Sequence, residues 1–366
     1  MTVEIGSTPP ADADALLVVE NLTVTFPTDD GAVQAVRGVS YTLRNGEAMG
    51  IVGESGSGKS VSSMAVMGLL PKTAQITGSV RFRGKELLGM REKDYTSIRG
   101  DKIAMIFQDP LTSLNPVYSV GKQIAEAVLA HNNVSKQAAR DRAIELLGVV
   151  GIPFPEQRVD NYPHELSGGM RQRIVIAIAM ANNPDVIIAD EPTTALDVTV
   201  QAQVLEALEA ARAETGAALV LITHDLGVIA GHAERVCVMY AGKLVETGGV
   251  EDVFYRPRMP YTLGLLGSLP RLDETGRERL TPIKGSPPSL LNLPPGCPFT
   301  PRCPVARDVC DHEEPVLLPV ADGGQAAHAA ACHFRDELVG ATASSLFGTA
   351  ADDAVIPDLA PSEVTP

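Results

Sequence analysis

A glycine-rich string between an apolar stretch and a helical one could bind phosphate. It reads Gly53-Glu54-Ser55-Gly56-Ser57-Gly58-Lys59-Ser60, after a predicted strand at 48–52 and before a predicted helix at 59–70. Glycines let the backbone wrap closely, so that successive N–H groups and the helix dipole point at phosphate oxygens. Lys59 would contact the β- and γ-phosphates, and Ser60 would ligate Mg²⁺. A flexible Gly/Ser-rich loop is the alternative, but the strand and helix flanks favour a nucleoside triphosphate site.

Two carboxylates end another apolar stretch. Asp190 and Glu191 directly follow the predicted strand 186–189. Asp190 can hold Mg²⁺ through water, and Glu191 is placed to polarise the water that attacks a γ-phosphate. A strand that ends in a solvated acidic pair is the ordinary alternative. Together with the phosphate-binding string, the pair favours nucleotide hydrolysis.

The string at 166–173 indicates a family. It reads Leu166-Ser167-Gly168-Gly169-Met170-Arg171-Gln172-Arg173 and precedes the acidic pair by about twenty residues. Ser167, Gly168 and Gly169 would begin a helix whose first N–H groups can bind phosphate. Ser-Gly-Gly is also an ordinary helix cap, but the full string closely resembles the signature of ABC ATPases. In that family, this helix end contacts the γ-phosphate of ATP bound to the other subunit.

The resemblance implies roles for further residues. Gln108, after the predicted strand 102–107, matches the glutamine that reaches Mg²⁺ and the attacking water. His224, after a predicted strand, matches the switch histidine at the γ-phosphate, although a lone histidine is more often structural. Asp197, in Ala195-Leu196-Asp197, matches the loop that crosses the subunit boundary. Phe26 matches the ring that stacks on adenine, although such a ring is often only core, and Val61 adjoins the phosphate-binding string.

A single set of these motifs implies a partner. In the ABC family, two ATPase domains pair head to tail and trap two ATP molecules between them. The chain has one set, so it is expected to pair with itself or with a similar second chain.

Longer strings resemble one branch, the importers of di- and oligopeptides and their nickel-importing relatives. The strings are Gln108-Asp109-Pro110-Leu111-Thr112-Ser113-Leu114-Asn115-Pro116, the run 191–199, Pro260-Tyr261-Thr262, Gly285-Ser286-Pro287-Pro288 and Arg302-Cys303-Pro304. The run 191–199 resembles the first of two paired ATPases, which implies a heterodimer. The resemblance also implies ATP and Mg²⁺, two permeases, an extracytoplasmic solute-binding protein and a place at the cytoplasmic face of the membrane.

Two alternative functions remain at this stage. One is an importer of nickel or another small solute, because the permease and the binding protein select the solute. The other is a soluble ABC-type ATPase that acts on DNA or ribosomes. Such proteins usually carry coiled coils, zinc modules or basic arms, and the sequence has none of these.

Four cysteines form a candidate metal-binding set. Cys297, Cys303, Cys310 and Cys332 are separated by five, six and twenty-one residues, so the Cys-x-x-Cys spacing of a zinc ribbon is missing. Iron–sulfur clusters tolerate varied spacing, and members of the peptide-importer branch carry a 4Fe-4S cluster at a similar set. A 4Fe-4S cluster, a zinc ion and four unliganded thiols remain the alternatives. Cys237, in the apolar run 236–239, is expected to be buried packing.

Strands and helices must position these residues. Apolar runs at 102–107, 186–189 and 218–222 are typical of buried parallel strands, with helical patterns at 120–150 and 168–181 between them. Further strands are predicted at 16–26 and, around a tight Asn45-Gly46 turn, at 39–43 and 48–52. The prediction is an α/β fold, a P-loop ABC ATPase core with an inserted α-helical subdomain and a small Cys-containing C-terminal domain.

Composition sets the outer limits. The expected division is a disordered tail at 1–14, an ATPase domain at 15–255 with its helical part at about 115–180, a C-terminal domain at 256–340 and a disordered acidic tail at 341–366. The net charge of −15 argues against nucleic acid as a partner. No signal peptide is expected, and the longest apolar runs are far shorter than the roughly 20 residues that span a bilayer.

Overall fold

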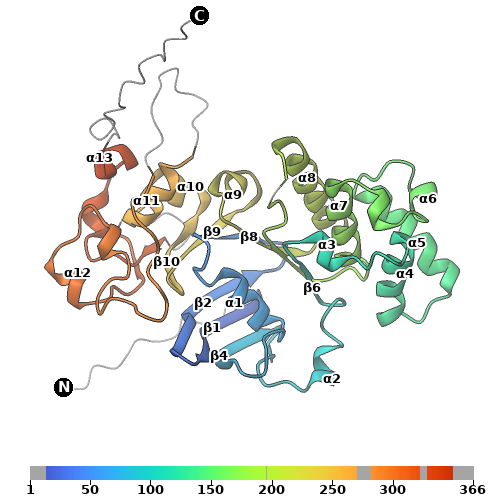
Figure 1. Ribbon diagram of the computed structural model, residues 1–366, viewed down its shortest axis with the longest axis horizontal. Helices are drawn as coiled ribbons and strands as arrows, with labels where there is room; N and C mark the ends of the chain where they lie inside the picture. Colours follow the sequence, from blue (N-terminus) through green and yellow to red (C-terminus); the bar gives the residue numbers. More distant parts are fainter. Residues whose placement is uncertain (1–13, 195, 270–281, 322–327, 349–366) are drawn as a thin grey trace, which may run out of the picture.

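A computed structural model describes residues 14–194, 196–269, 282–321 and 328–348. The middle of the molecule is built from two sheets (Figure 1). One is antiparallel with the strand order β2-β1-β4-β5. Its strands are β1 (Ala15–Thr28), β2 (Gly31–Arg44), β4 (Gln75–Phe82) and β5 (Lys85–Glu86).

The larger sheet has eight strands in the order β11-β12-β10-β9-β3-β8-β7-β6. These are β3 (Ala48–Val52), β6 (Ile103–Ile106), β7 (Val186–Asp190), β8 (Ala218–Thr223), β9 (Arg235–Tyr240), β10 (Lys243–Gly249), β11 (Leu318–Pro319) and β12 (Ala329–Ala330). From β9 to β6 the neighbouring strands run parallel, which confirms the predicted α/β architecture. The antiparallel pair of β10 and β12 adds the C-terminal segment to the edge of the sheet.

Both faces of the parallel sheet are buried. Alternate side chains of a strand point to opposite faces, so Leu219 and Leu221 of β8 enter one apolar cluster while Val220 and Ile222 enter another. The first cluster joins the sheet to helices, and the second joins it to the antiparallel sheet and the helix after β3. This explains why the parallel strands are continuous apolar runs.

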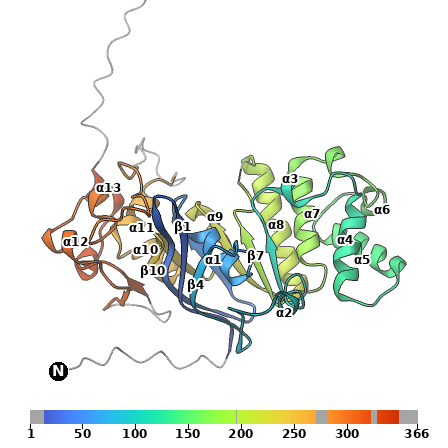
Figure 2. The ribbon, with the colours of Figure 1, turned by 60° about the horizontal axis from the view of Figure 1, so that its bottom comes forward.

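The helices occupy the flanks and one end of the molecule. They are α1 (Lys59–Val66), α2 (Glu92–Tyr95), α3 (Pro110–Ser113), α4 (Val120–His131), α5 (Lys136–Val149), α6 (Pro155–Arg158), α7 (Gly168–Ala179), α8 (Val198–Thr215), α9 (Leu226–His232), α10 (Val250–Tyr255), α11 (Pro260–Leu266), α12 (Asp308–His312) and α13 (Ala343–Phe347). Short 3-10 turns lie at Pro163–Glu165, Thr300–Arg302 and Arg335–Leu338. Helices α4, α5 and α6 lie together at the end opposite α12 and α13 (Figures 1 and 2).

The Asn45-Gly46 turn differs from a tight two-strand turn. β2 pairs with β1, whereas β3 pairs with β8 and β9, so the turn carries the chain from one sheet to the other. Gly46 has a positive φ of 68°, but Asn45 is not among the residues with positive φ. A type I′ hairpin needs positive φ at both positions, and the turn is therefore a connection between layers.

Two helices also differ from expectation. α1 ends at Val66 rather than near residue 70, because Gly68 turns the chain with a φ of 60°. α13 lies inside the range 341–366 that was predicted as a disordered tail. Thr342 caps α13 by accepting the N–H of Ser345, and Phe347 packs on the first apolar cluster. The tail 349–366 and residues 1–13 fall outside the described residues.

Within the described ranges, none of the helices combines the length and the apolar character needed to cross a bilayer.

Candidate nucleotide site

The phosphate-binding string forms a tightly wrapped loop between β3 and α1. Gly53 and Gly58 have φ values of 156° and 102°. A Cβ atom at Gly53 would lie 2.2 Å from the carbonyl oxygen of Met239, and one at Gly58 would lie 2.4 Å from that of Ala35. Glycine is therefore required at both positions by close backbone approach, and at Gly58 also by the left-handed conformation that caps α1.

Lys59 folds back over this loop. Its buried ammonium donates hydrogen bonds to the carbonyl oxygens of Gly53 at 2.7 Å and Glu54 at 3.0 Å. The Nζ atom lies 3.9 Å from a carboxylate oxygen of Glu191. Burial lowers the pKa of Lys59, while the Glu191 carboxylate acts in the opposite direction. The loop thus carries a cation where phosphate oxygens would approach.

Ser60 and Asp190 meet at the start of α1. The Ser60 hydroxyl donates a hydrogen bond of 2.9 Å to Asp190 at the end of β7. Burial raises the pKa of the Asp190 carboxyl, and the hydrogen bond from Ser60 opposes that shift. A hydroxyl beside a carboxylate offers the hard oxygen ligands that Mg²⁺ prefers.

Glu191 is the meeting point of the remaining side chains. One carboxylate oxygen accepts hydrogen bonds from the Gln108 amide at 3.2 Å and the Thr194 hydroxyl at 2.8 Å. The Nδ1 atom of His224 lies 3.4 Å from the same oxygen. Glu191 itself has a positive φ of 47°, and its N–H bonds to the carbonyl of Ile222 on β8. The carboxylate is therefore fixed by contacts from several elements.

The sheet explains this convergence. Gln108 follows β6, Glu191 follows β7, His224 follows β8 and Lys59 follows β3 by the loop, and these four strands are consecutive neighbours. Their carboxyl ends lie at one edge, where ligands bind in open parallel sheets. Sequence patterns missed Thr194 as a partner of Glu191, although its spacing of three residues could have suggested it.

The signature-like residues lie elsewhere. Ser167 caps α7 and accepts the N–H of Met170 at 3.3 Å, while Ser167 and Gly168 are exposed. Asp197 caps α8 by accepting the N–H groups of Thr199 and Val200. Helices α7 and α1 lie apart in both views (Figures 1 and 2). The α7 N-terminus is therefore exposed and does not contact the phosphate loop of its own chain.

The two remaining nucleotide contacts expected from sequence are half-buried. Phe26 lies on β1 opposite Val33 of β2, and Val61 lies on α1. Both side chains pack against the second apolar cluster. Ala195 of the boundary loop lies outside the described residues.

The four C-terminal cysteines line one cavity. Cys297, Cys303, Cys310 and Cys332 all contribute to its wall. Burial raises the pKa of Cys303 to about 12 and that of Cys332 to about 11. Among the described residues, no group of three or more His, Cys, Asp or Glu side chains could hold a metal ion. The four thiols thus share a cavity without forming a ligand group for zinc or a 4Fe-4S cluster. The predicted burial of Cys237 is confirmed.

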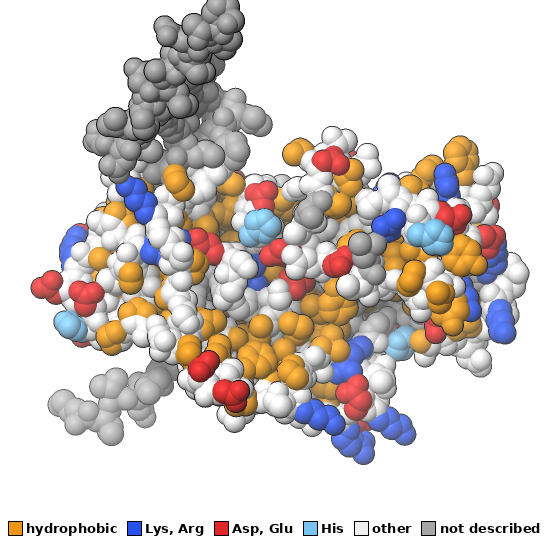
Figure 3. Space-filling model, viewed as in Figure 1, with side chains coloured by type: hydrophobic (Ala, Val, Ile, Leu, Met, Phe, Trp, Pro, Cys, Tyr) orange, Lys and Arg blue, Asp and Glu red, His pale blue; other side chains and the backbone are white. Residues whose placement is uncertain are grey.

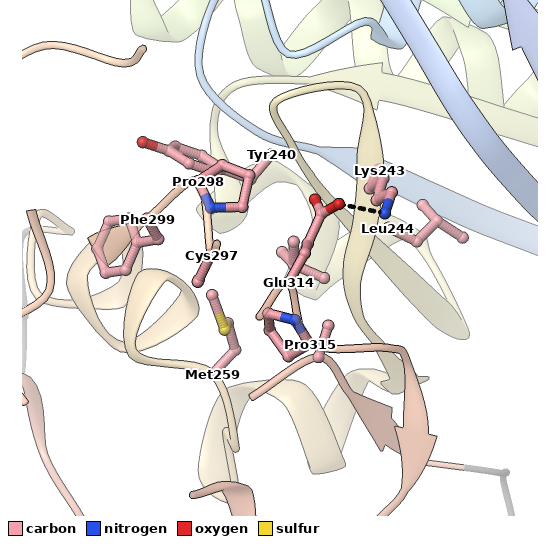
Figure 4. Close-up of a pocket in the computed structure, with 11 residues that line it drawn as sticks. Tyr240, Lys243, Leu244, Met259, Cys297, Pro298, Phe299, Glu314 and Pro315 are labelled. Carbon is pink, nitrogen blue, oxygen red and sulfur yellow. Dashed lines mark hydrogen bonds and ion pairs between the residues drawn. The ribbon is translucent and has the colours of Figure 1, made fainter. Parts of the chain in front are cut away.

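An adjoining cavity joins the C-terminal segment to the sheet. Cys297, Phe299 and Glu314 line it together with Lys243 (Figure 4). Glu314 pairs with Lys243 at 2.6 Å and with Arg37 of β2 at 2.8 Å. The segment is thus tied by charge to both sheets.

Two family models match separate parts of the chain. The model described as "ABC transporter" matches residues 36–194, and the model described as "Oligopeptide/dipeptide transporter, C-terminal region" matches residues 245–310. The dipeptide transport ATP-binding protein DppD of Bacillus subtilis is 53% identical over 326 residues, which cover 88% of this chain and 96% of that protein.

Other relatives extend the comparison. The oligopeptide transport ATP-binding protein OppD of Mycobacterium tuberculosis is 58% identical over 334 residues, 91% of this chain. The chain spans 54% of that relative's length. The dimeric structure of MJ0796, a bacterial ABC transporter cassette, has a TM-score of 0.57 and 29% identity, and the match covers 64% of this chain and 98% of MJ0796.

Proposed function

Because this chain belongs to the ABC transporter family of oligopeptide and dipeptide transport ATP-binding proteins, we propose that it hydrolyses ATP to drive peptide uptake through partner permeases. The observation that carries the proposal is the convergence of Lys59, Gln108 and His224 on Glu191, beside the Ser60–Asp190 pair. Its domains would be those predicted from the sequence, with the ATPase at 15–255 and a C-terminal domain at 256–340.

In this proposal each residue has a distinct task. The N–H groups of Gly53–Val61 and the Lys59 ammonium bind the β- and γ-phosphates, with Phe26 against the adenine. Ser60, Asp190 and Gln108 would hold Mg²⁺, which supplies charge neutralisation at the phosphates when bound. Glu191 orients and polarises the attacking water, while His224 contacts the γ-phosphate.

The exposed N-terminus of α7 would complete the site of a second subunit. Ser167, Gly168, Gly169 and Asp197 would contact ATP bound to the partner, because a helix N-terminus favours an anion. The dimeric MJ0796 structure supports pairing of two such chains. A similar second ATPase rather than a second copy is our proposed partner, and no role for nucleic acid is proposed.

A further surface supports docking to a permease at the cytoplasmic face of the membrane. Apolar side chains gather on the face in view (Figure 3). Phe107, which precedes Gln108 in the chain, is exposed, and so are Val117, at 69%, and Tyr118 a few residues further on. Two permeases and an extracytoplasmic solute-binding protein would complete the importer. Exposed apolar groups that are close in sequence to Gln108 would give a surface through which hydrolysis can move a partner.

The substitution Glu191→Gln tests the catalytic part. Hydrolysis should fall by at least about 100-fold, because the base is lost, whereas ATP binding should remain. Glu206→Gln, an exposed change on α8, is the matched control and should leave both unchanged. Unaltered hydrolysis in Glu191→Gln would remove Glu191 from the mechanism.

Gentle solubilisation and pull-down of the tagged chain tests the transport part. Two permeases, a second ATPase and a peptide-binding protein are expected to co-purify. Recovery of a nickel-binding protein instead would replace peptide by nickel, and recovery of ribosomal or DNA-repair proteins without a permease would overturn the transport function.

The 4Fe-4S cluster stays a separate hypothesis that rests on the shared cavity of Cys297, Cys303, Cys310 and Cys332. Four thiols around one cavity supply the donor type that such clusters use. Iron and acid-labile sulfide in anaerobically purified protein would establish it. Protein free of both would leave four unliganded thiols.

A further inference from the structure

Two C-terminal strings that nucleotide chemistry does not require converge on the phosphate loop. Tyr261 belongs to Pro260-Tyr261-Thr262, and Arg302 belongs to Arg302-Cys303-Pro304. Both contact Glu54, the second residue of the loop. The contacts join parts of the chain that are more than 200 residues apart.

The contacts fix nearly every polar group of Glu54. The Arg302 guanidinium donates two parallel hydrogen bonds to the Glu54 carboxylate, at 2.6 and 2.8 Å. The Glu54 N–H donates to the Tyr261 hydroxyl at 2.8 Å, and the Glu54 carbonyl accepts from Lys59 at 3.0 Å. A bidentate Arg–carboxylate pair adds geometric specificity to its energy. Glu54 is therefore held in one orientation from outside the loop.

The groups that hold Glu54 are themselves fixed. The Arg302 side chain is 4% exposed, and its guanidinium lies 5.9 Å from the ring centroids of Tyr240 and Phe299. The rings of Tyr240, Tyr261 and Phe299 pack on one another with centroid separations between 4.5 and 5.5 Å. Arg302 also donates to the Tyr240 hydroxyl at 3.3 Å. Close aromatic packing of this kind leaves little freedom for the guanidinium.

The negative charge of Glu54 should affect the binding of ATP. Glu54 places a carboxylate on the loop that would receive a triphosphate, and like charges repel. Its hydrogen bonds with Glu54 raise the pKa of the Arg302 guanidinium, so the cation is retained at all working pH values. The pair is thus neutral as a unit while both partners are present.

We propose that Arg302 is a positioning residue for ATP binding, which neutralises and orients Glu54 so that the phosphate loop accepts the triphosphate. The inference rests on the proposed ATPase function. Arg302 lies on the 3-10 turn Thr300–Arg302, and its hydrogen bonds go to Glu54, Tyr240 and the carbonyl oxygen of Lys284 rather than to the residues around Glu191. It should therefore affect ATP affinity rather than the chemical step.

Removing each charge in turn, and then both together, tests the proposal. Arg302→Gln leaves the Glu54 carboxylate uncompensated and should weaken binding of the ATP analogue adenylyl imidodiphosphate about fivefold. Glu54→Gln leaves the guanidinium uncompensated and should tighten binding by a similar factor. The double variant should return to within about twofold of the unsubstituted protein. Calorimetric titration of the full chain measures all three.

Controls separate charge from folding. Arg307→Gln removes the same charge from an exposed arginine of the same segment, paired with Glu337, and should leave affinity unchanged. Arg302→Lys keeps the charge without the bidentate geometry and should weaken binding less than Arg302→Gln. In steady-state hydrolysis, Arg302→Gln should raise KM for ATP about fivefold and leave kcat unchanged.

The outcomes are distinct. Failure of the unsubstituted protein to bind the analogue would overturn the proposed ATPase function. Normal binding with equal weakening in Arg302→Gln and Glu54→Gln would mean that the pair only holds the fold together. Normal binding with no change in either variant would also overturn the positioning role. If Arg302→Gln does not fold, the other two variants decide the question. Glu54→Gln is expected to tighten binding of the analogue, and Arg302→Lys is expected to weaken it.

Discussion

The buried carboxylate of Glu246 should be essential for docking the C-terminal segment. Glu246 lies on β10 opposite Ala330 of β12 and is fully buried. It accepts a hydrogen bond from His328 at 2.9 Å and one from the backbone N–H of Arg258. Burial raises the pKa of this carboxyl. The substitution Glu246→Ala removes the acceptor of both bonds at once.

The expected cost follows from those two donors. Each buried donor left without an acceptor costs about 1–3 kcal/mol, and breaking a buried ionisable pair from one side costs about 3–5 kcal/mol. We therefore expect Glu246→Ala to lower the free energy of unfolding by about 4 kcal/mol. Glu246→Gln keeps an oxygen acceptor and nearly the same volume, so its cost should be about 1–2 kcal/mol.

Urea unfolding followed by circular dichroism measures these costs, because the chain contains no Trp for fluorescence. Glu251→Ala, an exposed change at the start of α10, is the control and should stay within about 0.5 kcal/mol. Limited proteolysis should cut the segment after β10 faster in Glu246→Ala. A loss below about 1 kcal/mol with unchanged proteolysis would refute the role assigned to this carboxylate.

Two other predictions concern the loop and the thiols. Gly58→Ala should cost about 3 kcal/mol, from positive φ and the clash with Ala35, whereas Gly56→Ala, with φ of 80° and open space, should cost about 1 kcal/mol. Equal costs in urea unfolding would contradict the clash. The raised pKa values of Cys303 and Cys332 mean that the folded, metal-free protein keeps protons that the unfolded chain releases above pH 9. Its stability should therefore fall as pH rises from 9 towards 11, by about 4 kcal/mol more than in the variant with both residues changed to Ser. Parallel losses would contradict this.

The edge of the sheet that carries the candidate site could be predicted from sequence because its signals are local. Gln108, Asp190 and His224 each follow a short apolar run, and parallel strands bring such ends to one edge. In the structure, Gln108 and His224 contact Glu191, and Ser60 contacts Asp190. The sequence could show which residues follow each parallel strand. The sheet geometry then supplied the distances.

Features that depend on distant pairing could not be predicted in the same way. Asn45-Gly46 is a sequence typical of a hairpin turn. In the structure, however, β2 pairs with β1, whereas β3 pairs with β8 and β9. Local propensity carries no information about which strand another strand will pair with. The contact of Arg302 with Glu54 is similar, since neither residue has a neighbour in sequence that marks the other. The strings 260–262 and 302–304 could be singled out from the sequence, but the sequence does not show that they contact Glu54.

The C-terminal segment helps to hold the candidate nucleotide site in place. It adds β11 and β12 to the central sheet, ties Glu314 to Arg37 and Lys243, and sets Arg302 on Glu54. Because Arg302 is covalently next to Cys303, the cavity lined by the four cysteines and the phosphate loop are separated by one peptide unit and one ion pair. Packed aromatic rings transmit displacement rather than absorb it. Cys303 and Glu54 are thus both neighbours of Arg302, one through the chain and one through the ion pair, and this places the C-terminal segment directly against the proposed phosphate-binding loop.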